Sequence, residues 1–141
     1  MNSDWLSIYI VAPVLGWLSA HIVKFVIGLT KGQKDWRVFF RSGSMPSSHT
    51  AVVVALATVI AFRDGFGSPF FGIAATLGAI VIFDALNVRR AVGEQGKVLE
   101  ALVKKSGVTT PFFEAKGHTV TEVIVGAMIG LTVGGFLLQI L

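Results

Sequence analysis

Four stretches of mainly apolar residues, separated by polar segments, dominate the chain. They run from about 5 to 29, 49 to 62, 69 to 88 and 119 to 141, and the second is the shortest. A helix needs ~20 mainly apolar residues to cross the hydrocarbon core of a bilayer. The pattern therefore predicts an all-α fold, a polytopic membrane bundle of about four transmembrane helices that forms a single domain over residues 1–141.

The two longer polar segments add elements outside the membrane core. Residues 31–48 mix basic side chains with Trp36, Phe39 and Phe40, a composition typical of an interfacial segment beneath the lipid headgroups. Residues 91–117 are mostly polar, and the i,i+4 pair Glu100 and Lys104 supports a helix. We expect a cytoplasmic helical extension here, followed by a loop at 109–111.

Composition agrees with a membrane protein, since 53% of the residues are hydrophobic and 14% are charged. The absence of cysteine excludes disulfides, thiolate metal sites and cysteine nucleophiles. The net charge of +4 does not indicate nucleic acid, because the basic residues flank apolar stretches as membrane anchors do. A cleaved signal peptide is not expected, because the first stretch lacks a basic leader.

Basic residues are distributed unequally between the two sides of the predicted bundle. Arg63 alone lies on one side, whereas the loops on the other side carry ten: Lys31, Lys34, Arg37, Arg41, Arg89, Arg90, Lys97, Lys104, Lys105 and Lys116. The positive-inside rule makes the basic side cytoplasmic. The chain is thus predicted to be integral to the bacterial inner membrane, with both termini outside.

Small residues repeat along the last stretch, where Gly126, Gly130 and Gly134 are spaced by four. Such a face lets another backbone approach closely. The partner is either a helix of the same bundle or a second copy in a homodimer.

Polar side chains at membrane depth are costly and therefore candidates for function. In this chain they gather where all four stretches meet the predicted cytoplasmic boundary: His21, Lys24, Ser47, Ser48, His49, Asp84, Asn87, Arg89, Arg90, His118 and Glu122. This convergence predicts one site.

Two of the local patterns have alternative interpretations. Ser47 and Ser48 open a helix, where they either cap it or help its free amides bind an anion such as phosphate. Glu122 follows His118 by four residues, so it either orients the imidazole or completes a capping box with Thr119.

Together, two histidines at helix starts among basic groups suit phosphoryl transfer. One imidazole attacks phosphorus and the other protonates the leaving alkoxide, because an ordinary pKa of ~6.5 allows either role at neutral pH. Lys24, Arg89 and Arg90 are candidates to neutralise the phosphoryl oxygens.

Three motifs resemble the divergent family related to type 2 phosphatidic acid phosphatases, also labelled acid phosphatase and vanadium-dependent haloperoxidase-related. They are Met-Pro-Ser-Ser-His at 45–49, Asp84-Ala85 followed by Val88-Arg89-Arg90, and Gly117-His118-Thr119 with Glu122. The resemblance covers nearly the whole chain. Two motifs match the wider superfamily's Pro-Ser-Gly-His and His-x-x-x-Asp, with Ser48 replacing the glycine and Glu122 the aspartate.

The resemblance implies roles for these residues. His118 would be the nucleophile that forms a phosphohistidine, Glu122 its orienting partner and His49 the general acid. The Ser47–Ser48 segment would contact the phosphoryl oxygens.

Other superfamily positions are replaced in this chain. Lys34 and Arg41 match the Lys-x6-Arg-Pro motif only formally, because Ser42 stands in place of its proline, so we expect Lys24 in the lysine's role. Phe112 stands where the third motif has arginine. The expected substitutes are Arg89 and Arg90, one of them held by Asp84, with His21 in support.

The sequence thus predicts a metal-independent lipid phosphatase without a cofactor. Its substrate would be a phosphorylated membrane lipid of the phosphatidic acid, phosphatidylglycerophosphate or prenyl phosphate type. One alternative is a non-catalytic phospholipid-binding or lipid-transport protein that retains the anion site. Another is a divalent ion held by Asp84, Glu122 and the histidines.

Overall fold

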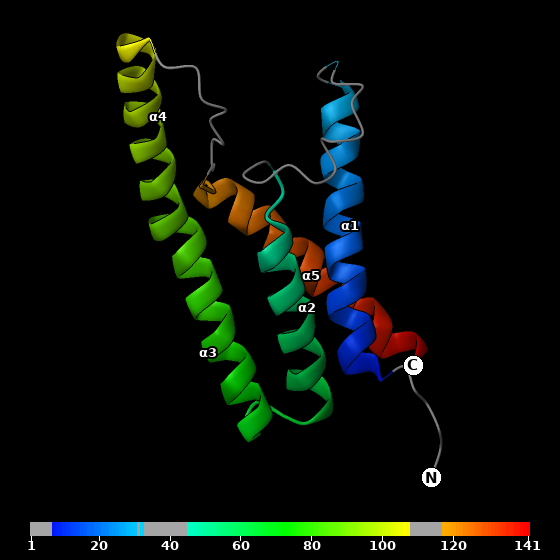
Figure 1. Ribbon diagram of the computed structural model, residues 1–141. Helices are drawn as coiled ribbons and strands as arrows, with labels where there is room; N and C mark the ends of the chain where they lie inside the picture. Colours follow the sequence, from blue (N-terminus) through cyan, green and yellow to red (C-terminus); the bar gives the residue numbers. More distant parts are fainter. Residues whose placement is uncertain (1–6, 31, 33–44, 108–116) are drawn as a thin grey trace.

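Figure 1 shows the computed structural model of the protein, which describes residues 7–30, 32, 45–107 and 117–141. These residues form helices and no strands, so the predicted all-α fold is confirmed. The elements are α1 (Ile8–Thr30), α2 (Ser48–Arg63), α3 (Pro69–Phe83), the π-helix η2 (Asp84–Val88), α4 (Arg89–Ser106) and α5 (Val120–Ile140). Most of the predicted interfacial segment and the predicted loop at 109–111 lie outside the described residues.

Three helical runs in the described part of the chain are long and apolar enough to cross a membrane. They are α1, α5 and the continuous 38-residue run Pro69–Ser106, which joins α3, η2 and α4. The 16 residues of α2 extend only ~24 Å at ~1.5 Å per residue, less than the ~30 Å hydrocarbon core. The protein is an integral membrane protein, and the predicted helical extension continues α3 without a break.

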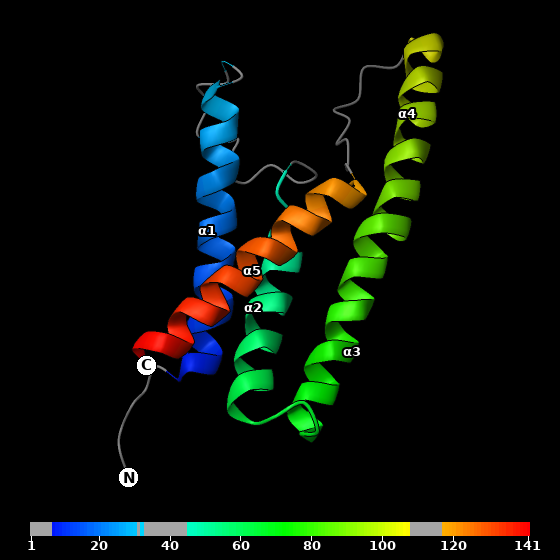
Figure 2. The ribbon, with the colours of Figure 1, turned by 180° about the vertical axis from the view of Figure 1, so that it is seen from behind.

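The helix α2 lies at the centre of the bundle. It stands between α1 and α3, and α5 crosses it obliquely, behind it in Figure 1 and in front of it in the reverse view of Figure 2. At one end, Ile8 and Ala12 of α1 pack with Val59 of α2 and Leu137 of α5. The opposite end therefore brings together the starts of α2 and α5 and the junction of α3 with α4, where most of the candidate side chains lie.

The glycine face of α5 packs against α2 inside the bundle. A Cβ added at Gly130 would lie 2.7 Å from the carbonyl oxygen of Ala51, and one at Gly134 would lie 2.8 Å from the Cβ of Thr58. Gly126 likewise faces the backbone of Ser47. The structure thus supports the interpretation of this face as a packing surface inside the bundle, with α2 as the helix that approaches it.

Replacing Gly130 with alanine is expected to lower the free energy of unfolding by about 1–3 kcal/mol, because the added methyl group must push α2 away. Gly135 provides the matched control on the same helix, since nothing lies within 4 Å of an added Cβ there. Thermal unfolding in detergent measures both variants. Equal melting temperatures for Gly130→Ala and Gly135→Ala would contradict the close packing of α2 and α5.

Candidate functional site

The start of α5 holds His118 and Glu122 against each other. Thr119 is the N-cap, and its side chain and that of Glu122 form a complete capping box. The same oxygen of Glu122, Oε2, accepts from the backbone N–H of Thr119 at 3.0 Å and lies 3.0 Å from Nδ1 of His118. Both interpretations of Glu122 are therefore correct at once. With Nδ1 engaged, Nε2 is the imidazole nitrogen left for chemistry.

His118 is anchored to the third span by its backbone. Its N–H donates to the carbonyl oxygen of Ala85 at 3.2 Å, and its side chain is buried. Gly117, just before it, lies so close to the backbone of Arg90 that any side chain would clash. A buried imidazole with one nitrogen fixed by a carboxylate is well prepared for one defined role.

The start of α2 is joined directly to the start of α5. The backbone N–H of Ser47 donates to the carbonyl oxygen of Glu122 at 2.9 Å. The hydroxyl of Ser47 caps α2 by accepting from Thr50, from its N–H at 3.4 Å and from its Oγ1 at 2.9 Å. Ser47 is thus a helix cap, and the structure shows its hydroxyl bonded within the chain. Ser48 is buried in the first turn, beside His49.

The π-helix η2 presents Arg89 to the site. In an α-helix, residues five apart point about 140° away from each other, but the wider π turn brings them to nearly the same face. Nε of Arg89 lies 2.6 Å from Oδ2 of Asp84. The prediction that Asp84 holds one of the two arginines is confirmed, and the arginine is Arg89.

His49 completes the cluster from the first turn of α2. It is exposed, and it lies within electrostatic range of Arg89, His118, Lys24 and Asp84. Lys24 is buried on α1 and also interacts electrostatically with Glu122. Side chains from α1, α2, η2 with α4, and α5 therefore meet at one end of the bundle, as the sequence predicted.

Some of the predicted site residues lie differently. Nε of Arg90 is 3.3 Å from Glu94 on the exposed face of α4, while its backbone lies against Gly117. Nδ1 of His21 lies 2.9 Å from the carbonyl oxygen of Trp17 on its own helix, and the two rings are 4.2 Å apart. The predictions for Lys34, Arg41 and Phe112 fall outside the described residues.

The geometry does not favour the divalent-ion alternative. Within the described ranges, no three His, Asp or Glu side chains lie together in a group that could hold a metal ion. The available chemistry is that of two imidazoles, one buried and one exposed, beside a guanidinium and an ammonium group. Such a set can bind a phosphate dianion, attack it and protonate a leaving group.

Two contributions were absent from the sequence interpretation: the carbonyl group of Ala85, which accepts from His118, and the close approach of Gly117 to Arg90. The presence of glycine immediately before His118 was the one sequence feature that could have indicated the close approach to Arg90.

Comparisons with known proteins agree with the three motifs. The uncharacterized membrane protein YuiD of Bacillus subtilis (strain 168) is 41% identical over 96 residues, which cover 64% of this chain and 61% of YuiD. The match thus spans less than two thirds of the relative's length, and no solved structure matches. The family model described as the Divergent PAP2 family matches residues 6–133, nearly the whole chain, and the protein therefore belongs to that family.

Proposed function

We propose that the protein is a membrane lipid phosphatase that works through a phosphohistidine on His118. The observation that carries this proposal is the pair of bonds made by Glu122. Its carboxylate lies 3.0 Å from the imidazole of His118, and its carbonyl oxygen accepts from the N–H of Ser47 at 2.9 Å. One residue thus orients the nucleophile and fixes the start of α2, from which His49 projects. Membership of the Divergent PAP2 family supports a phosphatase-related chemistry.

In the first step, Nε2 of His118 attacks the phosphorus atom while the bond from phosphorus to the lipid oxygen breaks. His49, in its protonated form, gives its proton to the departing alkoxide. Glu122 stabilises the positive charge that develops on the imidazole of His118, as the third member of a nucleophile–base arrangement does. Arg89 and Lys24 balance the charge spread over the phosphoryl oxygens.

In the second step, water hydrolyses the phosphohistidine. His49, now neutral, accepts a proton from the attacking water, and the bond between phosphorus and Nε2 breaks to release inorganic phosphate. The exposure of His49 suits this exchange of protons with water, whereas the burial of His118 protects the intermediate. Positive charge comes from side chains and the start of α2, so no step requires a metal ion.

The position of the site supports a lipid as the substrate. The site lies where the membrane-crossing helices end, and α4 continues beyond it with Lys97, Lys104 and Lys105. By the positive-inside rule this end faces the cytoplasm, here proposed as the cytoplasmic side of a bacterial inner membrane. A phosphorylated lipid of the inner leaflet reaches such a site with its headgroup first.

Purified protein in detergent, without added metal, is expected to release phosphate from at least one lipid in a panel of phosphatidic acid, phosphatidylglycerophosphate and prenyl phosphates. The variant His49→Ala should release it at least ~10²-fold more slowly, because general acid–base catalysis contributes about that much or more. Colorimetric measurement of phosphate tests both statements. Tight lipid binding by the wild type without turnover on any panel member would instead establish the lipid-binding alternative.

A further inference from the structure

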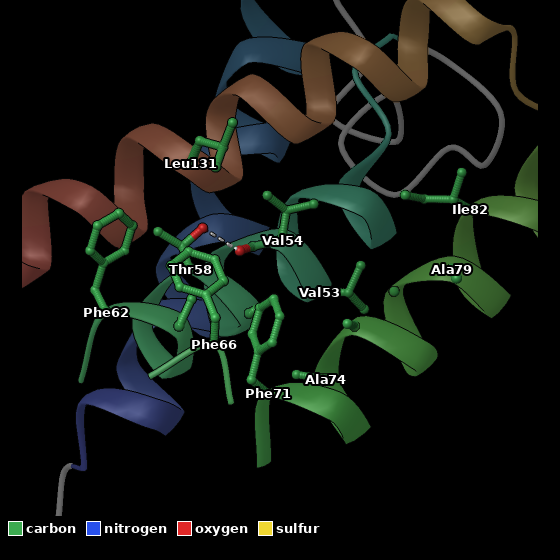
Figure 3. Close-up of a pocket in the computed structure, with 14 residues that line it drawn as sticks. Val53, Val54, Thr58, Phe62, Phe66, Phe71, Ala74, Ala79, Ile82 and Leu131 are labelled. Atoms are coloured by element: carbon green, nitrogen blue, oxygen red, sulfur yellow. Dashed lines mark hydrogen bonds between the residues drawn. The ribbon is translucent and has the colours of Figure 1, made fainter. Parts of the chain in front are cut away.

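An apolar groove runs along the bundle between α2 and α3 (Figure 3). It has a volume of ≈ 460 Å³, and small side chains form much of its walls: Ala57 and Ala61 of α2 and Ala74, Ala75, Gly78 and Ala79 of α3. The polar side chain in its lining is that of Thr58, whose Oγ1 donates to the carbonyl oxygen of Val54 at 2.7 Å. The lining of the groove therefore suits a hydrocarbon chain, because its side chains are apolar and the hydroxyl of Thr58 is already hydrogen-bonded within α2.

The upper end of the groove lies about one helical turn along α2 from His49 of the candidate site. Val53 in its wall follows His49 by four residues, so the two share one face of α2. On the facing helix, Ile82 is the lining residue nearest in sequence to Asp84, which holds Arg89. A molecule whose phosphate binds beside His49 thus has the start of the groove one helical turn away along α2.

Three phenylalanines line the lower end of the groove. Phe66 stacks edge-on against Phe62 and Phe71, with ring centroids 6.1 Å and 5.1 Å apart, and all three belong to the lining. At ~1.5 Å per residue, the lining of the groove extends ~14 Å along α2 from Val53 to Phe62. One leaflet of the hydrocarbon core is ~15 Å thick, half of ~30 Å. The groove is therefore about as deep as one leaflet.

We propose that this groove holds one hydrocarbon chain of the phosphorylated lipid whose headgroup binds beside His118, which makes a long-chain lipid phosphate the substrate class. The proposal rests on the proposed function. It is supported by the apolar lining, the matching depth and the start of the groove at Val53, one helical turn from His49 on the same face of α2. The chain enters sideways from the bilayer, since Ala75 and Ala79 of α3 are exposed along the opening.

The test uses phosphatidic acid with a photoreactive diazirine in the middle of one acyl chain, added to the full-length protein in lipid nanodiscs. Irradiation is expected to label peptides of α2 and α3 that line the groove. Ala75→Trp should lower that labelling about tenfold or more, because displacing even two methylene groups from an apolar site has such an effect. Ile73→Trp is the matched control, since Ile73 is 67% exposed on the same helix and does not line the groove.

The labelling does not depend on turnover, so it separates this proposal from the proposed function. His118→Ala should keep the groove labelling, and a wild type that is labelled in the groove but releases no phosphate would support the groove while removing the phosphatase. Three results would overturn the groove: equal labelling of outward faces on α1 and α5, indifference to Ala75→Trp, or cross-links showing a second protein chain there.

Discussion

Replacing His118 with alanine is expected to reduce phosphate release from the lipid substrate to the uncatalysed background, a loss on the order of 10⁴-fold or more. Removal of the nucleophile in other covalent hydrolases costs about 10⁶-fold. The structure explains why no neighbour can take its place. His118 is buried, its N–H is bonded to Ala85 and its Nδ1 to Glu122, so its Nε2 has a position that a water molecule cannot reproduce.

The same experiment has a direct chemical readout. Wild-type protein mixed briefly with a radiolabelled lipid phosphate and quenched in alkali should carry an acid-labile phosphoryl group on His118. His21→Ala is the comparison, because its imidazole bonds to Trp17 on its own helix, and that variant should still form the adduct. Full activity of His118→Ala, or a phosphoryl group mapped to His49, would remove the mechanism.

The helices were predictable because residues close to each helix start determine where it begins. Ser47 caps α2, Pro69 stands in the first turn of α3 and Thr119 caps α5, and these residue types are the ones that satisfy or tolerate the free amides of a helix start. The helical runs Ile8–Thr30, Pro69–Ser106 and Val120–Ile140 are long enough to cross a bilayer, whereas α2 is shorter. The glycine face of α5 was predicted as a close contact, but the sequence did not specify α2 as its partner.

The site was predicted as a set of residues but not as an arrangement. Hydrophobic periodicity gives no signal for the π turn at Asp84–Val88. The helix α3 that leads into it is apolar on all its faces, so its pattern of side chains does not reveal a change in helical twist. Without that turn, Asp84 and Arg89 would point apart, and Arg89 could not be distinguished from Arg90. The oblique path of α5 likewise depends on which helix packs against its glycine face. That choice depends on packing between segments that are distant in the sequence.

Glu122 illustrates how one residue satisfies two local interpretations. From the sequence alone, the capping box and the contact with His118 are alternative explanations, since each accounts for a glutamate at this spacing. In the structure Oε2 serves both, with Thr119 N–H and His118 Nδ1 each 3.0 Å away. A carboxylate oxygen can accept several bonds, so folding and chemistry need not be served by different residues.

The two roles of Glu122 can be separated by a pair of variants. Glu122→Gln is expected to slow phosphate release on the order of 10²–10³-fold, the scale of the loss when one electrostatic contact to the developing charge is removed, because the amide has no negative charge to stabilise the imidazole of His118. The melting temperature should change little because the amide oxygen still accepts from Thr119. Thr119→Ala should show the opposite, with the cap's ~1 kcal/mol of stability lost and a rate within a few-fold of wild type. Kinetics and thermal unfolding in the same detergent measure both. If Glu122→Gln lost stability and kept its rate, Glu122 would be a helix cap alone, and His118 would have to be oriented by another group.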